Sequence, residues 1–130
     1  MRDRRKYLQG ALLVFGIVAL LLYPLMLFWP SGWAWTPAQH EYQQMIIGIY
    51  ATLGVFLIWA SREPETHLSL IWFTVWSSVV HGGIMGVQAI VDPTERGHLL
   101  GDVPALFFVA IVLALLTPRR GTSGGASRAA

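Results

Sequence analysis

Residues 68–91 form an apolar stretch that is long enough to cross a lipid bilayer as a helix. The segment reads LSLIWFTVWSSVVHGGIMGVQAIV, and about 20 apolar residues rising 1.5 Å each span a hydrocarbon core of roughly 30 Å. At helical spacing its polar side chains share one face, which must turn toward protein or water. The stretch therefore predicts an integral membrane helix with one inward face. That face carries Thr74, Ser77, His81 and Gln88.

The composition supports the same class of protein. Hydrophobic residues make up 55% of the chain and charged residues 12%, about half the charged share of a soluble domain. The basic residues lie outside the apolar segments, a distribution typical of membrane topology, so we predict no nucleic-acid partner. The chain has no cysteine, which excludes disulfides, thiolate metal sites and Cys-linked haem.

Four apolar segments predict four helices in one domain over residues 1–118. A basic start before an apolar run also resembles a signal peptide, but this run is too long for a signal core, so we expect an uncleaved helix. Pro24 predicts a bend in it, and Thr36 with Pro37 and Gln39 predicts the start of the second helix. We expect helices at about 5–29, 37–60, 64–91 and 93–117, with a kink near 101–104, and a disordered cytoplasmic tail over 119–130.

The distribution of Lys and Arg predicts the orientation. The amino-terminal segment, the 61–66 turn and the tail together hold eight of the nine basic residues, and only Arg96 lies elsewhere. Cytoplasmic loops carry the excess of Lys and Arg. We therefore expect an all-α integral membrane four-helix bundle in which both termini are cytoplasmic.

This topology brings polar residues together at the outer face, where they form a candidate ligand pocket. His81 would lie roughly 10 Å deeper than Gln88 by helical rise. Helix capping alone also explains Asp92, Glu95 and Asp102. The pocket candidates are Glu41, Gln44, Thr74, Ser77, His81, Gln88, Asp92, His98 and Asp102.

Metal and cofactor chemistry remain open alternatives at this face. His98 and Asp102 stand at a four-residue spacing that two metal ligands or an ion pair could use, and Glu41 is a third candidate ligand. No HExxH string is present. His81 is either a packing residue that is hydrogen-bonded within the bundle or a ligand, proton or cofactor site. We assign no cofactor, while haem with His98 as second axial ligand, a quinone and a divalent cation are alternatives.

Glycines mark candidate helix interfaces. Gly82 and Gly86 form a GxxxG pattern, which lets another helix approach closely, and Gly48 lies on the polar face of the second helix. The partner helix could belong to this chain or to another. A homo-oligomer or a subunit of a membrane complex is therefore expected, with the lipid bilayer as surroundings.

The string EYQQMIIGIYATLGVFLIWASREP, followed by HLSLIWFTVWSSVVHGGIMGVQAIVDPTERGHLLGDVPAL, resembles a family of small bacterial four-helix membrane proteins catalogued as a domain of unknown function. Helix count and loop placement are also similar to DoxX-type four-helix membrane proteins. The resemblance implies a multi-pass protein of the bacterial inner membrane, and no particular chemistry.

Three functions remain open. The leading hypothesis is a non-enzymatic membrane subunit, or an assembly or ligand-binding protein, with an extracytoplasmic polar pocket. The second is a redox, haem- or quinone-associated protein that uses His81 and the acidic outer mouth. The third is a small dimeric transporter. No P-loop, dinucleotide fingerprint or nucleophile elbow is present, so the sequence indicates no enzyme class.

Overall fold

A computed structural model describes residues 2–34 and 40–119, and all secondary structure in those ranges is helical. The all-α prediction is confirmed. The predicted start of the second helix at Thr36 and most of the 119–130 tail lie outside the described residues. The helices are α1 (Arg2–Leu20), α2 (Leu22–Phe28), α3 (Pro30–Trp33), α4 (His40–Ala60), α5 (Leu68–Val91) and α6 (Asp102–Leu116), with 3-10 helices η1 (Pro64–Thr66) and η2 (Pro93–Leu99).

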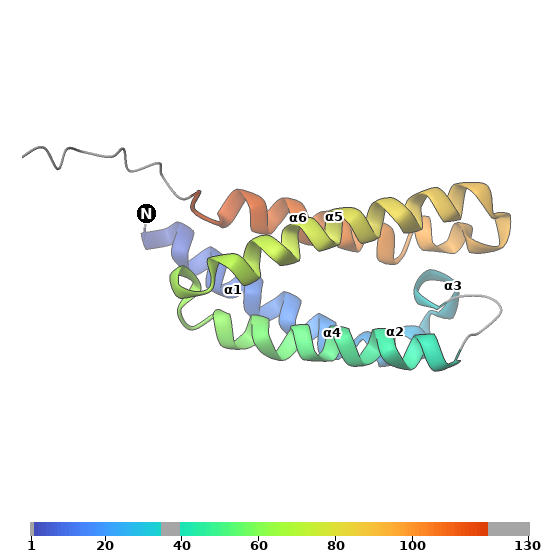
Figure 1. Cartoon of the computed structure of the whole chain (residues 1–130), viewed down its shortest axis with the longest axis horizontal. Coiled ribbons are helices and arrows are strands. Elements are labelled where there is room, and N and C mark those ends of the chain that lie inside the picture. The colour runs from blue at the N-terminus through green and yellow to red at the C-terminus, as the bar shows by residue number, and fades with distance from the viewer. Residues whose placement is uncertain (1, 35–39, 120–130) are drawn as a thin grey trace, which may run out of the picture.

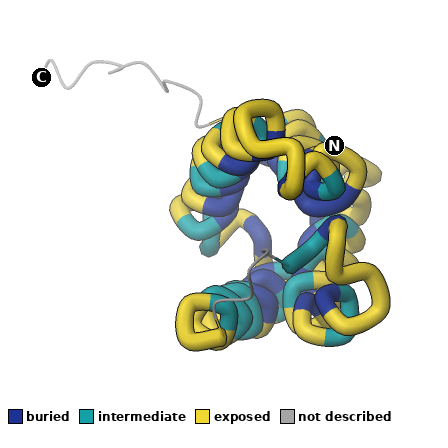
Figure 2. Tube along the Cα trace, turned by 90° about the vertical axis from the view of Figure 1, so that its right-hand side faces the viewer, coloured by how far each residue is buried: buried dark blue, intermediate teal, exposed yellow. Residues whose placement is uncertain are grey.

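Several helical segments are long and apolar enough to cross a membrane. Three segments of the described chain meet this condition alone: α4, α5 and the continuous run Pro93–Leu116. The pair α1 and α2 meets it together, with a bend of 57° between the two helices. The outer sides of the helices are exposed and the inner sides are buried (Figure 2). Large apolar side chains such as Phe73, Trp76 and Phe108 lie on the exposed side, as expected for contact with lipid.

The first predicted helix is broken. We expected one helix over 5–29, but α1 ends at Leu20 and α2 begins at Leu22. Pro24 explains the position of the break, because its ring has no N–H and clashes with the carbonyl four residues earlier, that of Leu20. The backbone hydrogen bonds of α1 end with Leu21 N donating to Ile17 O at 3.0 Å. Those of α2 begin with Leu25 N donating to Leu21 O at 3.1 Å.

The third predicted helix begins later than expected, and the fourth is divided close to the kink predicted near 101–104. Pro64 starts the short η1 turn, and the long helix begins only at Leu68. The segment predicted as helix over 93–117 is divided into η2 and α6, with the break at residues 100–101. Two glycines and Pro104 fall around this break, where glycine and proline disfavour a regular helix.

The helices form two antiparallel hairpins that lie in two layers. In Figure 1, α1 runs beside α4 in the lower layer and α5 runs beside α6 in the upper layer. The lower layer is close-packed at Gly16 and Gly54. A Cβ on Gly54 would lie 2.6 Å from Gly16 O, and a Cβ on Gly16 would lie 2.7 Å from Gly54 O. Only glycine at both positions allows α1 and α4 to approach so closely.

The two layers are joined at both ends. At the end with the chain termini, α1 contacts α6, and the Arg4 guanidinium donates to the final carbonyls of α6, with Nη2 at 2.7 Å from Leu115 O and Nε at 3.0 Å from Leu116 O. At the other end α3 packs on η2, with no room for a side chain at Gly97 beside Ser31.

The apolar core fills only the half of the molecule near the termini. Its most buried members include Leu12, Leu57, Ile71 and Leu113, all fully buried. These residues come from both hairpins, so they hold the layers together at that end. The interlayer space next to this core contains a cavity, and Leu57 contributes to both.

Candidate ligand-binding cavity

A cavity of about 120 Å³ lies between the two hairpins. Side chains from α1 to α6 and from η2 line it, so both layers contribute to its wall. Most of the lining is apolar, as illustrated by Phe15, Leu53 and Leu106. On α4 the lining extends from Gln43 to Leu57, a distance of roughly 20 Å by helical rise. The cavity is therefore a long, mainly apolar slot, the shape that suits a lipophilic molecule.

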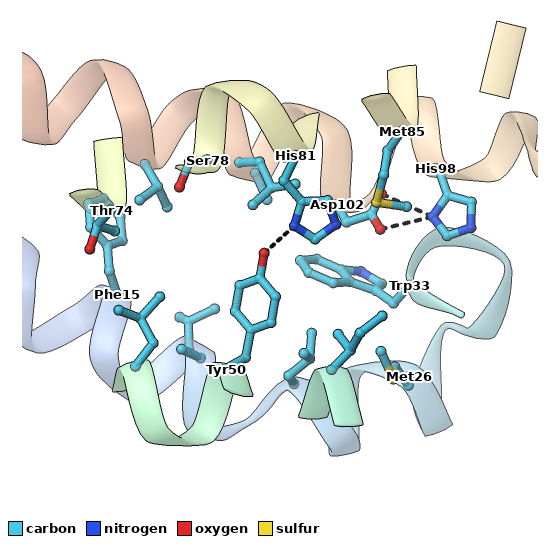
Figure 3. A pocket seen from close by; sticks show the side chains of 18 of the residues that line it. Phe15, Met26, Trp33, Tyr50, Thr74, Ser78, His81, Met85, His98 and Asp102 are labelled. Carbon is cyan, nitrogen blue, oxygen red and sulfur yellow. Dashed lines mark hydrogen bonds and ion pairs between the residues drawn. The ribbon is translucent and has the colours of Figure 1, made fainter. Parts of the chain in front are cut away.

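Tyr50 and His81 meet across the middle of this slot. The Tyr50 side chain projects from α4 and that of His81 from α5, and the hydroxyl is hydrogen-bonded to His81 Nδ1 (Figure 3). The ring centroids are 5.7 Å apart. This hydrogen bond links the two hairpins. It also places two polar groups among the apolar side chains that line the cavity.

A second polar group closes the slot toward η2. His98 Nε2 lies 2.9 Å from the Glu95 carboxylate, and His98 Nδ1 lies 2.9 Å from Asp102 Oδ2. The His98 residue is only 2% exposed, Glu95 7% and Asp102 9%. Each ring nitrogen of His98 therefore faces the carboxylate of a different residue.

Asp92 caps the start of η2 at the surface. Its carboxylate accepts a hydrogen bond from the Thr94 hydroxyl at 2.7 Å and another from the Thr94 backbone N–H at 2.9 Å. These two bonds lower the pKa of Asp92. The ionised carboxylate therefore stabilises the folded turn above the ordinary carboxyl pKa, and this contribution is lost as the pH falls through the lowered value. Asp92 therefore has the helix-capping role that the sequence offered as the alternative to a place in the pocket.

The sequence from residue 3 to residue 129 matches the model of a family described as a family of unknown function, DUF6632. The chain belongs to DUF6632. This confirms the predicted resemblance to an uncharacterised family, while the similarity to DoxX-type proteins stays a prediction. Comparison with curated proteins finds no match, and comparison with solved structures finds none either. The function of this DUF6632 chain must therefore be argued from the cavity itself.

The structure brings four of the nine pocket candidates to the cavity: Thr74, His81, His98 and Asp102. The other five lie elsewhere. Ser77 is half-buried and donates to its own helix, at Thr74 O and 3.2 Å, while its neighbour Ser78 lines the cavity. The remaining four are exposed outside it: Glu41, Gln44, Gln88 and Asp92.

Four polar lining residues were not among the candidates. Tyr50 and Gln43 lie on α4, Trp33 lies on α3, and Ser78 lies on α5. A sequence signal for α4 did exist, because its lining residues recur every three or four positions. The full set on that helix is Gln43, Ile46, Tyr50, Leu53 and Leu57.

Two of the three glycines predicted at helix interfaces face another helix, and the third does not. A Cβ on Gly82 would lie 3.2 Å from the Phe107 ring, and one on Gly86 would lie 3.7 Å from Val103. Both glycines therefore face α6 of the same chain. Gly48 has no atom within 4 Å of its Cβ position, so it packs against no described helix.

The geometry does not assemble the proposed metal or haem ligands. Within residues 2–34 and 40–119, no three His, Asp or Glu side chains are placed to hold a metal ion. Glu41 is exposed on α4, away from the cavity that His98 and Asp102 line. Both ring nitrogens of His98 face carboxylates, so this histidine is not placed to be the second axial ligand of a haem.

Proposed function

We propose that this chain is a four-span membrane protein that binds a lipophilic small molecule between its two hairpins. In this proposal α1 with α2, α4, α5 and η2 with α6 each cross the bilayer of a bacterial inner membrane, as a four-helix bundle. The observation that carries the proposal is the slot of about 120 Å³, with apolar walls from both layers and polar groups at only a few points. Ligand sites in proteins have this composition.

The distribution of charge supports an orientation for the proposal. Four arginines lie at the end of the bundle where α1 begins and α6 ends: Arg4 contacts Leu116, Arg5 pairs with Glu65, Arg62 contacts Gln9, and Arg119 lies beside Leu68. Arg96 lies in η2, which is at the opposite end (Figure 1). Lys and Arg are enriched on the cytoplasmic side. The termini are therefore assigned to the cytoplasm, and the His98 group is assigned to the outer leaflet.

An unpaired donor in the wall also favours a ligand. Trp33 Nε1 is buried and has no hydrogen-bond partner within the described residues. A buried polar group without a partner costs about 1–3 kcal/mol. An acceptor atom of a bound molecule, or a water that accompanies it, would remove this cost. Trp33 points into the same part of the cavity as His81 and Asp102 (Figure 3).

A quinone-linked redox role is the second candidate function. The Tyr50–His81 pair favours it, because a hydroxyl and an imidazole beside an apolar slot can hydrogen-bond a ring carbonyl and exchange a proton with it. The wall would then hold the isoprenoid or alkyl chain of the quinone. The two candidates differ in the molecule that should occupy the slot.

Native mass spectrometry of the protein, extracted with its surrounding lipid, tests the proposal. We expect one small molecule to remain bound at close to one per chain in the wild type. Ala105→Phe should abolish its retention, because Ala105 lines the cavity and a phenyl group would fill the slot. Ile111→Phe on the exposed side of the same helix is the matched control. Equal retention in both folded variants, or no bound molecule in the wild type, would contradict a ligand site here.

A further inference from the structure

At the polar end of the cavity, acidic side chains outnumber basic ones. Glu95 and Asp102 flank a single imidazole, that of His98, and Asp102 itself lines the cavity. No Lys or Arg is among the described residues that line the cavity, and Arg96 in η2 is exposed. A charge in a wall of low polarity acts strongly on a bound ion, because little water screens it.

Aromatic rings stand in the wall close to this charge. Trp33, from α3, points into the same region as Asp102, and Tyr50 lies on the opposite layer from His81 (Figure 3). The faces of Trp and Tyr rings attract cations, with Trp the strongest, and this attraction increases when the site is dry. The aromatic rings and the Asp102 carboxylate therefore both favour a positively charged ligand, through two different kinds of interaction.

The deeper part of the slot is suited to the apolar part of such a ligand. Below His81, the lining consists of groups such as Phe15, Leu53 and Leu57, and the Thr74 hydroxyl donates to Leu70 O of its own helix at 2.9 Å. The Thr74 hydroxyl is therefore already hydrogen-bonded, and the buried Ser78 is the other hydroxyl that α5 contributes to the lining. An alkyl or aryl body fits this region, and a polar head fits the end near Asp102.

We propose that the cavity selects lipophilic monovalent cations, which are molecules with one positively charged head and an alkyl or aryl body. The head lies between Asp102 and the Trp33 and Tyr50 rings, and the body extends toward Leu57. This proposal rests on the function proposed above and names the class of its ligand. An anionic amphiphile such as a fatty acid is disfavoured, because its head would meet the carboxylate of Asp102.

Three decyl probes with different heads test the proposal. The protein is placed in nanodiscs of zwitterionic phosphatidylcholine, and binding of decyltrimethylammonium, decanesulfonate and decylubiquinone is measured by equilibrium dialysis against empty nanodiscs. We expect the cation to bind at least about tenfold more tightly than the anion or the quinone. Asp102→Asn should reduce this preference about tenfold. Asp92→Asn should leave it unchanged, since Asp92 is an exposed carboxylate at the same end but outside the cavity.

Each result has a defined meaning. Equal binding of the three probes, or tighter binding of the anion, would overturn cation selectivity while the occupied cavity seen by mass spectrometry would still stand. Tightest binding of decylubiquinone would overturn it in favour of the redox candidate. If Asp102→Asn fails to fold, the comparison of the three probes on the wild type still decides. Loss of the bound molecule from the mass spectrum is a separate result, and it concerns the cavity itself.

Discussion

Replacement of His98 by leucine should lower the free energy of unfolding by about 3–5 kcal/mol, the cost of removing one partner from a buried ionic group. His98 lies 2.9 Å from carboxylate oxygens of both Glu95 and Asp102 and is 2% exposed. Without the imidazole the two buried carboxylates lose the partner that they share. Unfolding by sodium dodecyl sulfate in mixed micelles measures the effect.

Two further variants separate the charge effect from simple loss of a side chain. His40→Leu changes an exposed histidine and should alter the stability by less than about 0.5 kcal/mol. The triple change Glu95→Leu, His98→Leu, Asp102→Leu removes the whole ionic group and should be more stable than His98→Leu alone, since apolar replacement of a complete buried ion group is often neutral. A single variant as stable as the wild type, or a triple variant less stable than the single one, would refute the ionic account.

Gly54→Ala should also destabilise the protein strongly, by about 3 kcal/mol, which is the upper range for overpacking. The added methyl group would lie 2.6 Å from Gly16 O and 3.1 Å from a Leu20 side-chain carbon. A backbone oxygen cannot rotate away as a flexible side chain can, so α1 and α4 must separate. The same titration in mixed micelles measures the change.

Gly48→Ala is the matched control for this effect. Gly48 lies on the same helix, six positions earlier, and no atom is within 4 Å of its Cβ position. Alanine favours a helix over glycine by up to about 1 kcal/mol, so this variant should be neutral or slightly stabilised. Equal destabilisation by the two changes would mean that helix propensity, and not close approach of α1 and α4, governs both positions.

Local sequence patterns predicted the helices well. The apolar run at 68–91 has the bounds of α5, since length and hydrophobicity determine a span. The bend in the first helix also followed from a local cause, the missing N–H and the bulky ring of Pro24. Its size depends on how α2 turns to pack on α3 and α4, and a local argument cannot give it.

The cavity was predicted only in part, because its residues come from helices whose mutual rotation the sequence does not state. On α4 we predicted Glu41 and Gln44 as pocket residues and Gly48 as an interface residue, and all three are exposed. The neighbouring face, with Gln43 and Tyr50, lines the cavity. Both faces mix polar and apolar residues at helical spacing, so periodicity alone could not choose between them.

The same reason explains the missed glycine contact. Gly16 and Gly54 are 38 positions apart, and neither stands in a GxxxG pattern that would mark it as an interface. Their importance appears only when α1 and α4 are placed side by side. By contrast, Gly82 and Gly86 form a GxxxG pattern, which predicts a close-packing face on one helix. The structure places this face against α6.

The central claim is that the chain crosses the membrane four times and that the His98 end of the cavity lies at the outer leaflet. Because the chain has no cysteine, single cysteines can be placed at exposed positions and labelled in intact cells with a maleimide that cannot cross the membrane. The account predicts labelling of Ser31→Cys and Thr94→Cys in intact cells, and labelling of Asp3→Cys, Glu63→Cys and Arg119→Cys only after permeabilisation. Labelling of Glu63→Cys and Thr94→Cys from the same side would contradict a crossing by α5, and with it the whole arrangement.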